Sequence, residues 1–407
     1  MDGMAEKYLV FRFGGEEAYV RKDRVNLIGG VDAVIFDCDG VLIDIRESYD
    51  RAISEAVAYI LEGFTGCSFP KDLISNEIIF LFRKTGGFNN DWDSCYGILM
   101  FMLCNLPDEF QRVFRSCIKK IDKEEKPRQR FLQISSAVRE SDLCGILDEK
   151  LLDELINSLR SFTSNLDESG ILSVDRNLVN RKSAKDYYED LKHLLICPYK
   201  VGGGIIPTVF EEIFCGSELV KEVYGVDPVF YNGKGRIENE RVIVSSEALN
   251  RLSSILGRSN FGIASGSRFK SAKYVLGDFL NYFKPDALIF LDDVEREEER
   301  ILKETGMMVN LKKPNIFSLL RVAECLEPFN VALYVGDSME DALIVEKAKE
   351  KDSRFIFAGV YRYSGSKDAL LKSFMKAEAD VVLPSVNEIP LLLEELRRVK
   401  IEGGRSL

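Results

Sequence analysis

The order of short apolar runs along the chain is the feature that most constrains its fold. Six runs are short enough to be buried strands, and the last five alternate with segments of helical periodicity. The runs are residues 34–36, 261–264, 287–291, 331–335, 355–358 and 379–383. Such alternation predicts an α/β fold with a parallel, doubly wound sheet. The first run would join this sheet from about 220 residues upstream of the others.

The sequence between the first and second runs has a different character. From Ser48 to about Glu247 most segments show the apolar spacing of amphipathic helices. We therefore expect a large, mainly helical domain over 46–257, inserted after the first strand of a core domain made of 30–45 and 258–407. At 407 residues, the chain is long enough for two hydrophobic cores.

Two alternating segments precede the first core strand. Leu9–Phe13 and Ala18–Val20 both alternate, and Gly14 and Gly15 lie between them. This pattern predicts a β-hairpin, which we assign to an N-terminal extension over 1–29.

Composition narrows the possible functions. A net charge of −11 argues against a broad nucleic-acid surface, and no apolar stretch approaches the length of a membrane span. The nine cysteines are scattered and form no Cys-x-x-Cys pair, which favours reduced thiols and a cytoplasmic protein. The oligomeric state stays open.

The single histidine limits the available chemistry. His193 lies in a predicted helix without a neighbouring serine or cysteine motif, so a Ser–His–Asp device or a multi-histidine metal site is not expected. Acid–base chemistry then falls mainly to carboxylates and lysines.

Polar residues follow the predicted strands, where ligands bind in open parallel sheets. These residues are Asp37, Asp39, Ser265, Asp292, Asp293, Asp337 and Asp341, with Lys312 and Lys313 before Pro314. Several carboxylates together bind a phosphate dianion only with an intervening metal ion, and Mg²⁺ prefers such oxygen ligands. We therefore expect a Mg²⁺ site and a small phosphorylated substrate at this edge.

Four of these segments resemble the motifs of the haloacid dehalogenase (HAD) superfamily, in the same order. Asp37-Cys38-Asp39-Gly40 resembles motif I, and Ser265 in Ile-Ala-Ser-Gly-Ser resembles motif II. Lys313-Pro314 resembles motif III, and Gly336-Asp337-Ser-Met-Glu-Asp341 resembles motif IV.

The resemblance implies a role for each motif residue. Asp37 would be the nucleophile, and Asp39 the general acid and base that also gives a backbone carbonyl to the metal. Ser265 and Lys313 would bind the phosphate, with Gly266 beside it. Asp337 would ligate Mg²⁺. Asp341 would join either the metal's surroundings or Lys313, so the expected metal set is Asp37, Asp39, Asp337 and Asp341.

An aspartate at the second motif I position is typical of HAD phosphatases and mutases. The expected activity is therefore that of a phosphatase acting through an aspartyl-phosphate. The alternatives are a phosphomutase and a binding protein with a vestigial site.

The insertion resembles a C1-type cap but is much longer than the usual one. Within it, Gly86–Asp93 is polar and glycine-rich and contains the only tryptophan. Asn89, Asn90 and Asp91 are predicted to contact the substrate's leaving group. The alternative interpretation is a connection between two helices.

Several other residues have simpler interpretations. Ser265 could cap a following helix, and Asp341 could stabilise a helix's first turn. Asp292 and Asp293 could serve either as turn and capping residues or behind the site. Cys38 is expected to pack, and the charged run Glu295–Arg300 to form a solvated helix face.

Overall fold

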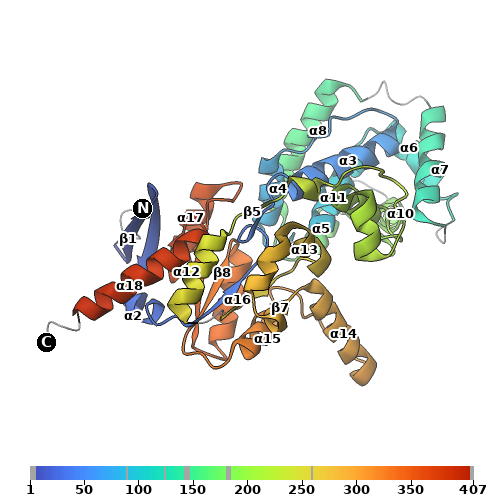
Figure 1. Ribbon diagram of the computed structural model, residues 1–407. Helices are drawn as coiled ribbons and strands as arrows, with labels where there is room; N and C mark the ends of the chain where they lie inside the picture. Colours follow the sequence, from blue (N-terminus) through green and yellow to red (C-terminus); the bar gives the residue numbers. More distant parts are fainter. Residues whose placement is uncertain are drawn as a thin grey trace. The chain divides into compact units, whose positions relative to one another are not determined.

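The computed structural model describes residues 6–88, 90–122, 125–141, 147–179, 185–257 and 260–403. The chain divides into two compact units, coloured along the sequence in Figure 1. Residues 1–46 and 240–407 form one, which we call the sheet unit, and residues 47–239 form the other, the helical unit. None of the helices in the described ranges is both long and apolar enough to cross a lipid bilayer.

In the described part of the chain, eight strands of the sheet unit form one sheet in the order β1-β2-β10-β9-β8-β3-β6-β7. The strands are β1 (Tyr8–Phe13), β2 (Glu16–Arg21), β3 (Ala33–Phe36), β6 (Phe261–Ala264), β7 (Leu288–Ile289), β8 (Ala332–Gly336), β9 (Phe355–Val360) and β10 (Val381–Leu383). From β10 to β7 all neighbours pair in parallel. The α/β class and the mainly parallel sheet predicted from the sequence are confirmed.

Helices cover both faces of this sheet. Alternate strand residues point to opposite sides, and both sets are apolar, so each face needs to be buried. Val34 and Phe36 belong to one apolar cluster, and Ala33 and Ile35 to another. The helices of this unit are α2 (Val25–Ile28), α12 (Ser246–Leu256), α13 (Phe269–Leu276), α14 (Leu291–Thr305), α15 (Phe317–Leu326), α16 (Met339–Lys349), α17 (Lys367–Lys376) and α18 (Ile389–Gly403). The first cluster includes residues of α12, α13 and α18, and the second includes residues of α15, α16 and α17.

The N-terminal hairpin is part of this sheet rather than a separate extension. β1 and β2 pair antiparallel, and β2 also pairs antiparallel with β10. Gly14 and Gly15 have φ of 56° and 87°, the positive values that a tight two-residue hairpin turn requires. The assignment of 1–29 to an extension is corrected, because Val20 of β2 is fully buried in the core of the sheet unit.

The predicted domain boundary at residue 257 is also corrected, because the helical unit ends at Asn239. A short strand, β5 (Arg241–Val242), pairs antiparallel with β4 (Ile43–Asp44). The following helix α12 buries Leu249 and Leu252 in the core of the sheet unit. Helical periodicity alone does not reveal which core an amphipathic helix joins.

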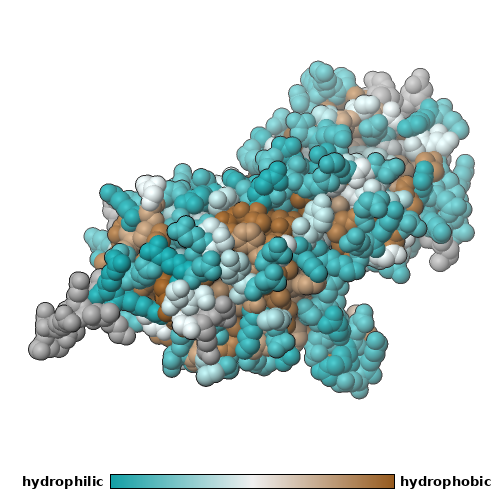
Figure 2. All heavy atoms as spheres, in the orientation of Figure 1, coloured by the Kyte–Doolittle hydropathy of each residue, from teal (hydrophilic) through white to brown (hydrophobic). Residues whose placement is uncertain are grey.

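The predicted strand at 287–291 is shorter in the structure, where β7 spans only Leu288–Ile289. Helix α14 starts at Leu291, and the carboxylate of Asp293 accepts the backbone N–H of Phe290 at 3.0 Å. Asp293 is thus a helix-capping residue. The charged run Glu295–Arg300 lies in α14, of which only Val294 is buried, and Figure 2 shows hydrophilic residues along this helix.

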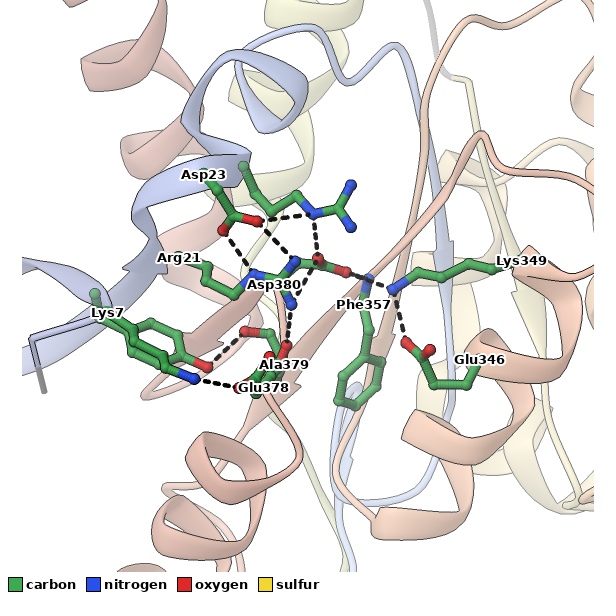
Figure 3. A network of polar contacts seen from close by, with 11 residues as sticks. Lys7, Arg21, Asp23, Glu346, Lys349, Phe357, Glu378, Ala379 and Asp380 are labelled. Carbon is green, nitrogen blue, oxygen red and sulfur yellow. Dashed lines mark hydrogen bonds and ion pairs between the residues drawn. The ribbon is translucent and has the colours of Figure 1, made fainter. Parts of the chain in front are cut away.

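A buried carboxylate anchors the hairpin on the side of the sheet where β10 begins (Figure 3). Asp380 is 0% exposed, and its Oδ2 accepts Lys349 Nζ at 2.9 Å and the N–H of Phe357 at 3.0 Å. Its Oδ1 lies 3.5 Å from Arg24 Nε and 4.0 Å from Arg21 Nη1. Cations from three elements therefore surround one carboxylate.

In its described residues the second unit is mainly helical, as the sequence predicts. Its helices are α3 (Tyr49–Thr65), α4 (Asn76–Arg83), α5 (Asp91–Cys104), α6 (Asp108–Ile118), α7 (Pro127–Glu140), α8 (Glu149–Phe162), α9 (Ile171–Val179), α10 (Lys185–Ile196) and α11 (Ile205–Tyr224). Helix α5 contacts α3, α9, α10 and α11, and Ser94 to Cys104 within it are all buried. It is the central helix of this unit.

Candidate active site

The candidate site lies beside β3, at the point in the sheet where successive strands stop being added on one side and begin to be added on the other. The chain runs outward from β3 to β6 and β7, and then from β8 to β9 and β10 on the other side. Ligands bind at such switch points, beyond the carboxyl ends of the strands. Asp37 follows β3, and Asp337 follows β8, the neighbouring strand.

Asp37 is 9% exposed as a residue, and its carboxylate directly faces a cation. Its Oδ1 accepts the N–H of Cys38 at 2.7 Å, and its Oδ2 lies 3.0 Å from Lys313 Nζ. The backbone N–H of Asp37 donates to the carbonyl of Val335 in β8 at 2.9 Å, which extends the strand ladder to this residue. Cys38 is fully buried in the apolar core, which confirms its packing role.

Lys313 is positioned by Tyr334 and Asp341. Lys313 Nζ donates to the hydroxyl of Tyr334 at 2.8 Å and to Asp341 Oδ1 at 2.9 Å. The Tyr334 hydroxyl also donates to Asp341 Oδ1, at 3.0 Å. Lys312, by contrast, pairs with Glu295 at 3.0 Å and contributes no such contact.

Asp341 uses both of its oxygens. Its Oδ2 accepts the N–H of Ser338 at 3.2 Å and the Ser338 hydroxyl at 2.6 Å, which forms a capping box at the start of α16. Both interpretations of this residue therefore apply, since it stabilises a first helical turn and orients Lys313.

A close approach brings Asp337 beside the loop of Asp37. Gly40 has φ of 71°, and a Cβ there would lie 1.9 Å from Asp337 Oδ2. Only glycine fits such a position. One carboxylate oxygen from each of Asp37, Asp337 and Asp341 lies within 4.8 Å of the other two.

This cluster has the donor chemistry of a site for a hard divalent cation. Its potential ligands are carboxylate oxygens, which suit a hard divalent cation. Both oxygens of Asp341 and both oxygens of Asp37 already contact donors, so these contacts do not rank one of the two above the other as a ligand.

The charge balance of the site perturbs its ionisation. Burial raises the pKa of Asp37 to about 7, and the charges of Asp341 and Asp39 add to the effect of burial while Lys313 opposes it. Burial also raises the pKa of Asp337 well above its usual range, again with help from Asp341 and Asp37. Burial alone would lower the pKa of Lys313, but the carboxylates of Asp341 and Asp37 raise it well above its ordinary value. The cluster carries more negative charge than its lysine balances.

Asp39 contacts the loop that follows β6. Its Oδ2 accepts the hydroxyl of Ser267 at 2.7 Å. The Ser265 hydroxyl donates to Ser267 Oγ at 3.1 Å and accepts the N–H of Ser267 at 3.1 Å. Ser265 does not cap α13, whose N-cap residue is Arg268.

Residues behind this loop hold it in place. Asp292 Oδ2 accepts the N–H of Phe269 at 2.8 Å, and its Oδ1 pairs with Arg268 at 3.1 Å. The N–H of Ser265 donates to the carbonyl of Ile289 at 3.0 Å. Gly266 is exposed, with open space where a side chain would lie.

The predicted leaving-group residues lie in the helical unit and make local contacts. Asn89 is outside the described residues. Asn90 caps α5, because its side-chain oxygen accepts the N–H of Trp92 at 2.9 Å. Asp91 pairs with Arg83 at 2.9 Å. These contacts are those of a connection between α4 and α5, and substrate contact by this segment stays a prediction.

Two residues of the site were not predicted from the sequence to have a role. Tyr334 is an interior residue of an apolar strand, where tyrosine normally indicates packing. Ser267 is part of the motif around Ser265, but its partner Asp39 is 228 residues away in the chain. For Tyr334, the one available signal was a tyrosine in the strand just before Asp337 and Asp341.

Comparisons with known proteins support the fold. No family model matches the chain, and no curated protein matches it. The X-ray structure of a Northeast Structural Genomics Consortium target matches with a TM-score of 0.60 and 18% identity, covering 90% of this chain and 100% of that one. Phosphatase Tt82 from Thermococcus thioreducens matches with a TM-score of 0.45 and 19% identity, covering 84% of this chain and 98% of that one. The first of these likenesses indicates a shared fold.

Proposed function

We propose that this chain is a Mg²⁺-dependent phosphatase of the HAD type, acting on a small phosphorylated metabolite through an aspartyl-phosphate on Asp37. One observation carries the proposal. The buried carboxylate of Asp37 lies 3.0 Å from Lys313 Nζ, with oxygens of Asp337 and Asp341 within 4.8 Å. A carboxylate oxygen beside a fixed cation, with further carboxylates that can hold a metal ion, suits phosphoryl transfer to an aspartate.

The proposed reaction has two steps. In the first, an Asp37 oxygen bonds to phosphorus, the bond from phosphorus to the leaving oxygen breaks, and Asp39 gives that oxygen a proton. In the second, water bonds to phosphorus, Asp39 takes the water's proton, and the bond from Asp37 to phosphorus breaks to release phosphate. Lys313 would balance charge on the phosphate oxygens throughout.

The ionisation of Asp37 supports the need for a divalent cation. Burial raises the pKa of Asp37 to about 7 and so disfavours the ionised, nucleophilic form of this carboxylate. Mg²⁺, held by Asp37, Asp337 and the carbonyl of Asp39, would supply positive charge that favours the nucleophilic form and neutralises phosphate.

Hydrolysis of p-nitrophenyl phosphate tests this proposal. We expect EDTA to abolish turnover and Mg²⁺ to restore it, while Ca²⁺ substitutes poorly because its coordination is larger and looser. Mass spectrometry of the protein quenched in acid during turnover should find a phosphoryl group on Asp37. Full activity in EDTA would exclude the metal site, and phosphate on another residue would exclude the nucleophile.

A screen of phosphorylated metabolites with Mg²⁺ would then identify the substrate. We expect one metabolite to be preferred over p-nitrophenyl phosphate. Equal, slow turnover of every ester would contradict a dedicated metabolite phosphatase.

A further inference from the structure

The hydroxyl of Ser267 joins two loops of the candidate site. Its Oγ donates to Asp39 Oδ2 at 2.7 Å, and this contact connects the loop after β3 to the loop after β6. Hydrogen bonds to a charged acceptor are shorter and stronger than those between neutral groups. The contact therefore restricts the orientation of the Asp39 carboxylate.

Ser267 is itself fixed by its neighbours. Its Oγ accepts the Ser265 hydroxyl at 3.1 Å, and its N–H donates to Ser265 Oγ at 3.1 Å. Its carbonyl accepts the N–H of Leu291, the first residue of α14, at 3.0 Å. Because these hydrogen bonds fix the position of Ser267, its hydroxyl can orient the Asp39 carboxylate.

We propose that Ser267 is a positioning residue for Asp39. The proposal rests on the proposed function. By its hydrogen bond to Oδ2, Ser267 holds the Asp39 carboxyl group in the orientation from which it exchanges a proton with the leaving oxygen or with water. Ser267 needs no contact with the substrate for this role.

The positioning role is consistent with both steps of the proposed reaction. As the bond from phosphorus to the leaving oxygen breaks, Asp39 gives that oxygen a proton and becomes a carboxylate that stays hydrogen-bonded to Ser267. When water bonds to phosphorus, its proton moves to Asp39 and restores the acid. Ser267 keeps its own proton in both steps.

Two substrates of similar shape separate positioning from substrate binding. Phenyl phosphate has a more basic leaving group than p-nitrophenyl phosphate and depends more on protonation by Asp39. We expect Ser267→Ala to lower kcat for phenyl phosphate by about 10-fold, because small misplacement of a catalytic group has a large cost. The p-nitrophenyl ester should lose much less, inhibition by inorganic phosphate should be unchanged, and Ser267→Thr, which keeps the hydroxyl, should restore most of the rate.

Ser385→Ala is the matched control. Its hydroxyl donates to Glu388 at 2.7 Å in the loop after β10, so it loses a similar hydrogen bond outside the site. We expect both substrates to be hydrolysed as by the wild type.

Several outcomes would overturn the proposal. Equal losses on both esters with weaker phosphate inhibition would make Ser267 a substrate contact, and unchanged rates would leave it without a role. A crystal structure of Ser267→Ala with the Asp39 carboxylate unmoved would also contradict positioning, whatever the activity. A wild-type protein without turnover of any phosphate ester would instead contradict the proposed function.

Discussion

Two buried aspartates, one beyond the carboxyl end of a strand and one before the amino end of another strand of the same sheet, differ in how their charge is balanced. Asp37 lies beyond the carboxyl end of β3, and Asp380 immediately precedes β10. Their exposed fractions are 9% and 0%. Burial alone therefore does not distinguish them.

The neighbours of the two carboxylates do distinguish them. Asp380 lies among three cations, Lys349, Arg21 and Arg24, and also accepts a backbone N–H. Asp37 shares its single lysine with Asp341 and has other carboxylates nearby. A balanced buried charge joins elements of the fold, whereas an excess of negative charge is relieved by protonation, towards which the raised pKa of Asp37 points, or by a bound cation. The comparison indicates a structural role for Asp380 and is consistent with the chemical role proposed for Asp37.

Substitution of Asp37 should have the largest effect on activity. Asp37→Asn keeps the shape of the side chain but removes the nucleophilic charge, so we expect turnover to fall by at least about 10³-fold. The measurement is kcat for p-nitrophenyl phosphate with saturating Mg²⁺. Near-normal turnover would refute the nucleophile and erase the contrast with Asp380.

Two adjacent lysines test whether the position of the positive charge beside Asp37 matters. Lys313→Met removes the charge beside Asp37, and we expect kcat/KM to fall by about 10²-fold or more. Lys312→Met is the matched control, because the Lys312 ammonium group pairs with Glu295 in a half-exposed contact. Equal losses in the two variants would mean that the position of the charge does not matter.

Asp380→Asn should reverse the pattern and affect stability instead. Removing one partner from a buried ion-pair network costs about 3 kcal/mol, so the free energy of unfolding in urea should fall by that amount. Activity per folded molecule should stay close to that of the wild type. A loss of kcat without a loss of stability would contradict the structural role of Asp380.

The smallest expected effect is a pH dependence of stability without metal. The pKa of Asp37 is raised by burial to about 7, against 3.8 for an ordinary aspartate. Between pH 3.8 and about 7, the folded protein thus retains a proton on Asp37 that the unfolded chain has lost. Over this range Asp37 lowers the free energy of unfolding by an amount that grows as the pH rises.

Asp37→Asn removes this cost, so in EDTA its Tm should exceed that of the wild type at pH 8 and match it near pH 4. Calorimetry at the two pH values checks this. A larger gain at pH 4 than at pH 8 would contradict the raised pKa, and Asp380→Asn should show no gain at either pH.

The sequence by itself determined which strands end in the polar residues of the site. Parallel strands place their carboxyl ends at one edge, so Asp37 and Asp337 meet once β3 and β8 are neighbours. The structure also places Lys313 Nζ 3.0 Å from Asp37. The position of the aspartates at the strand ends could be predicted because local apolar runs and strand direction are properties of short segments, and the roles of these residues stay predictions.

Tertiary structure decided the contacts between residues far apart in the chain. No local pattern states that Tyr334 contacts Lys313, that Ser267 contacts Asp39, or that α12 packs in the sheet unit. Nor did the alternation of β2 reveal its pairing with β10. Each of these contacts depends on which surfaces remain exposed once the sheet has formed. A hydroxyl or an apolar face can pair with many different partners, so the local sequence does not specify which one it contacts.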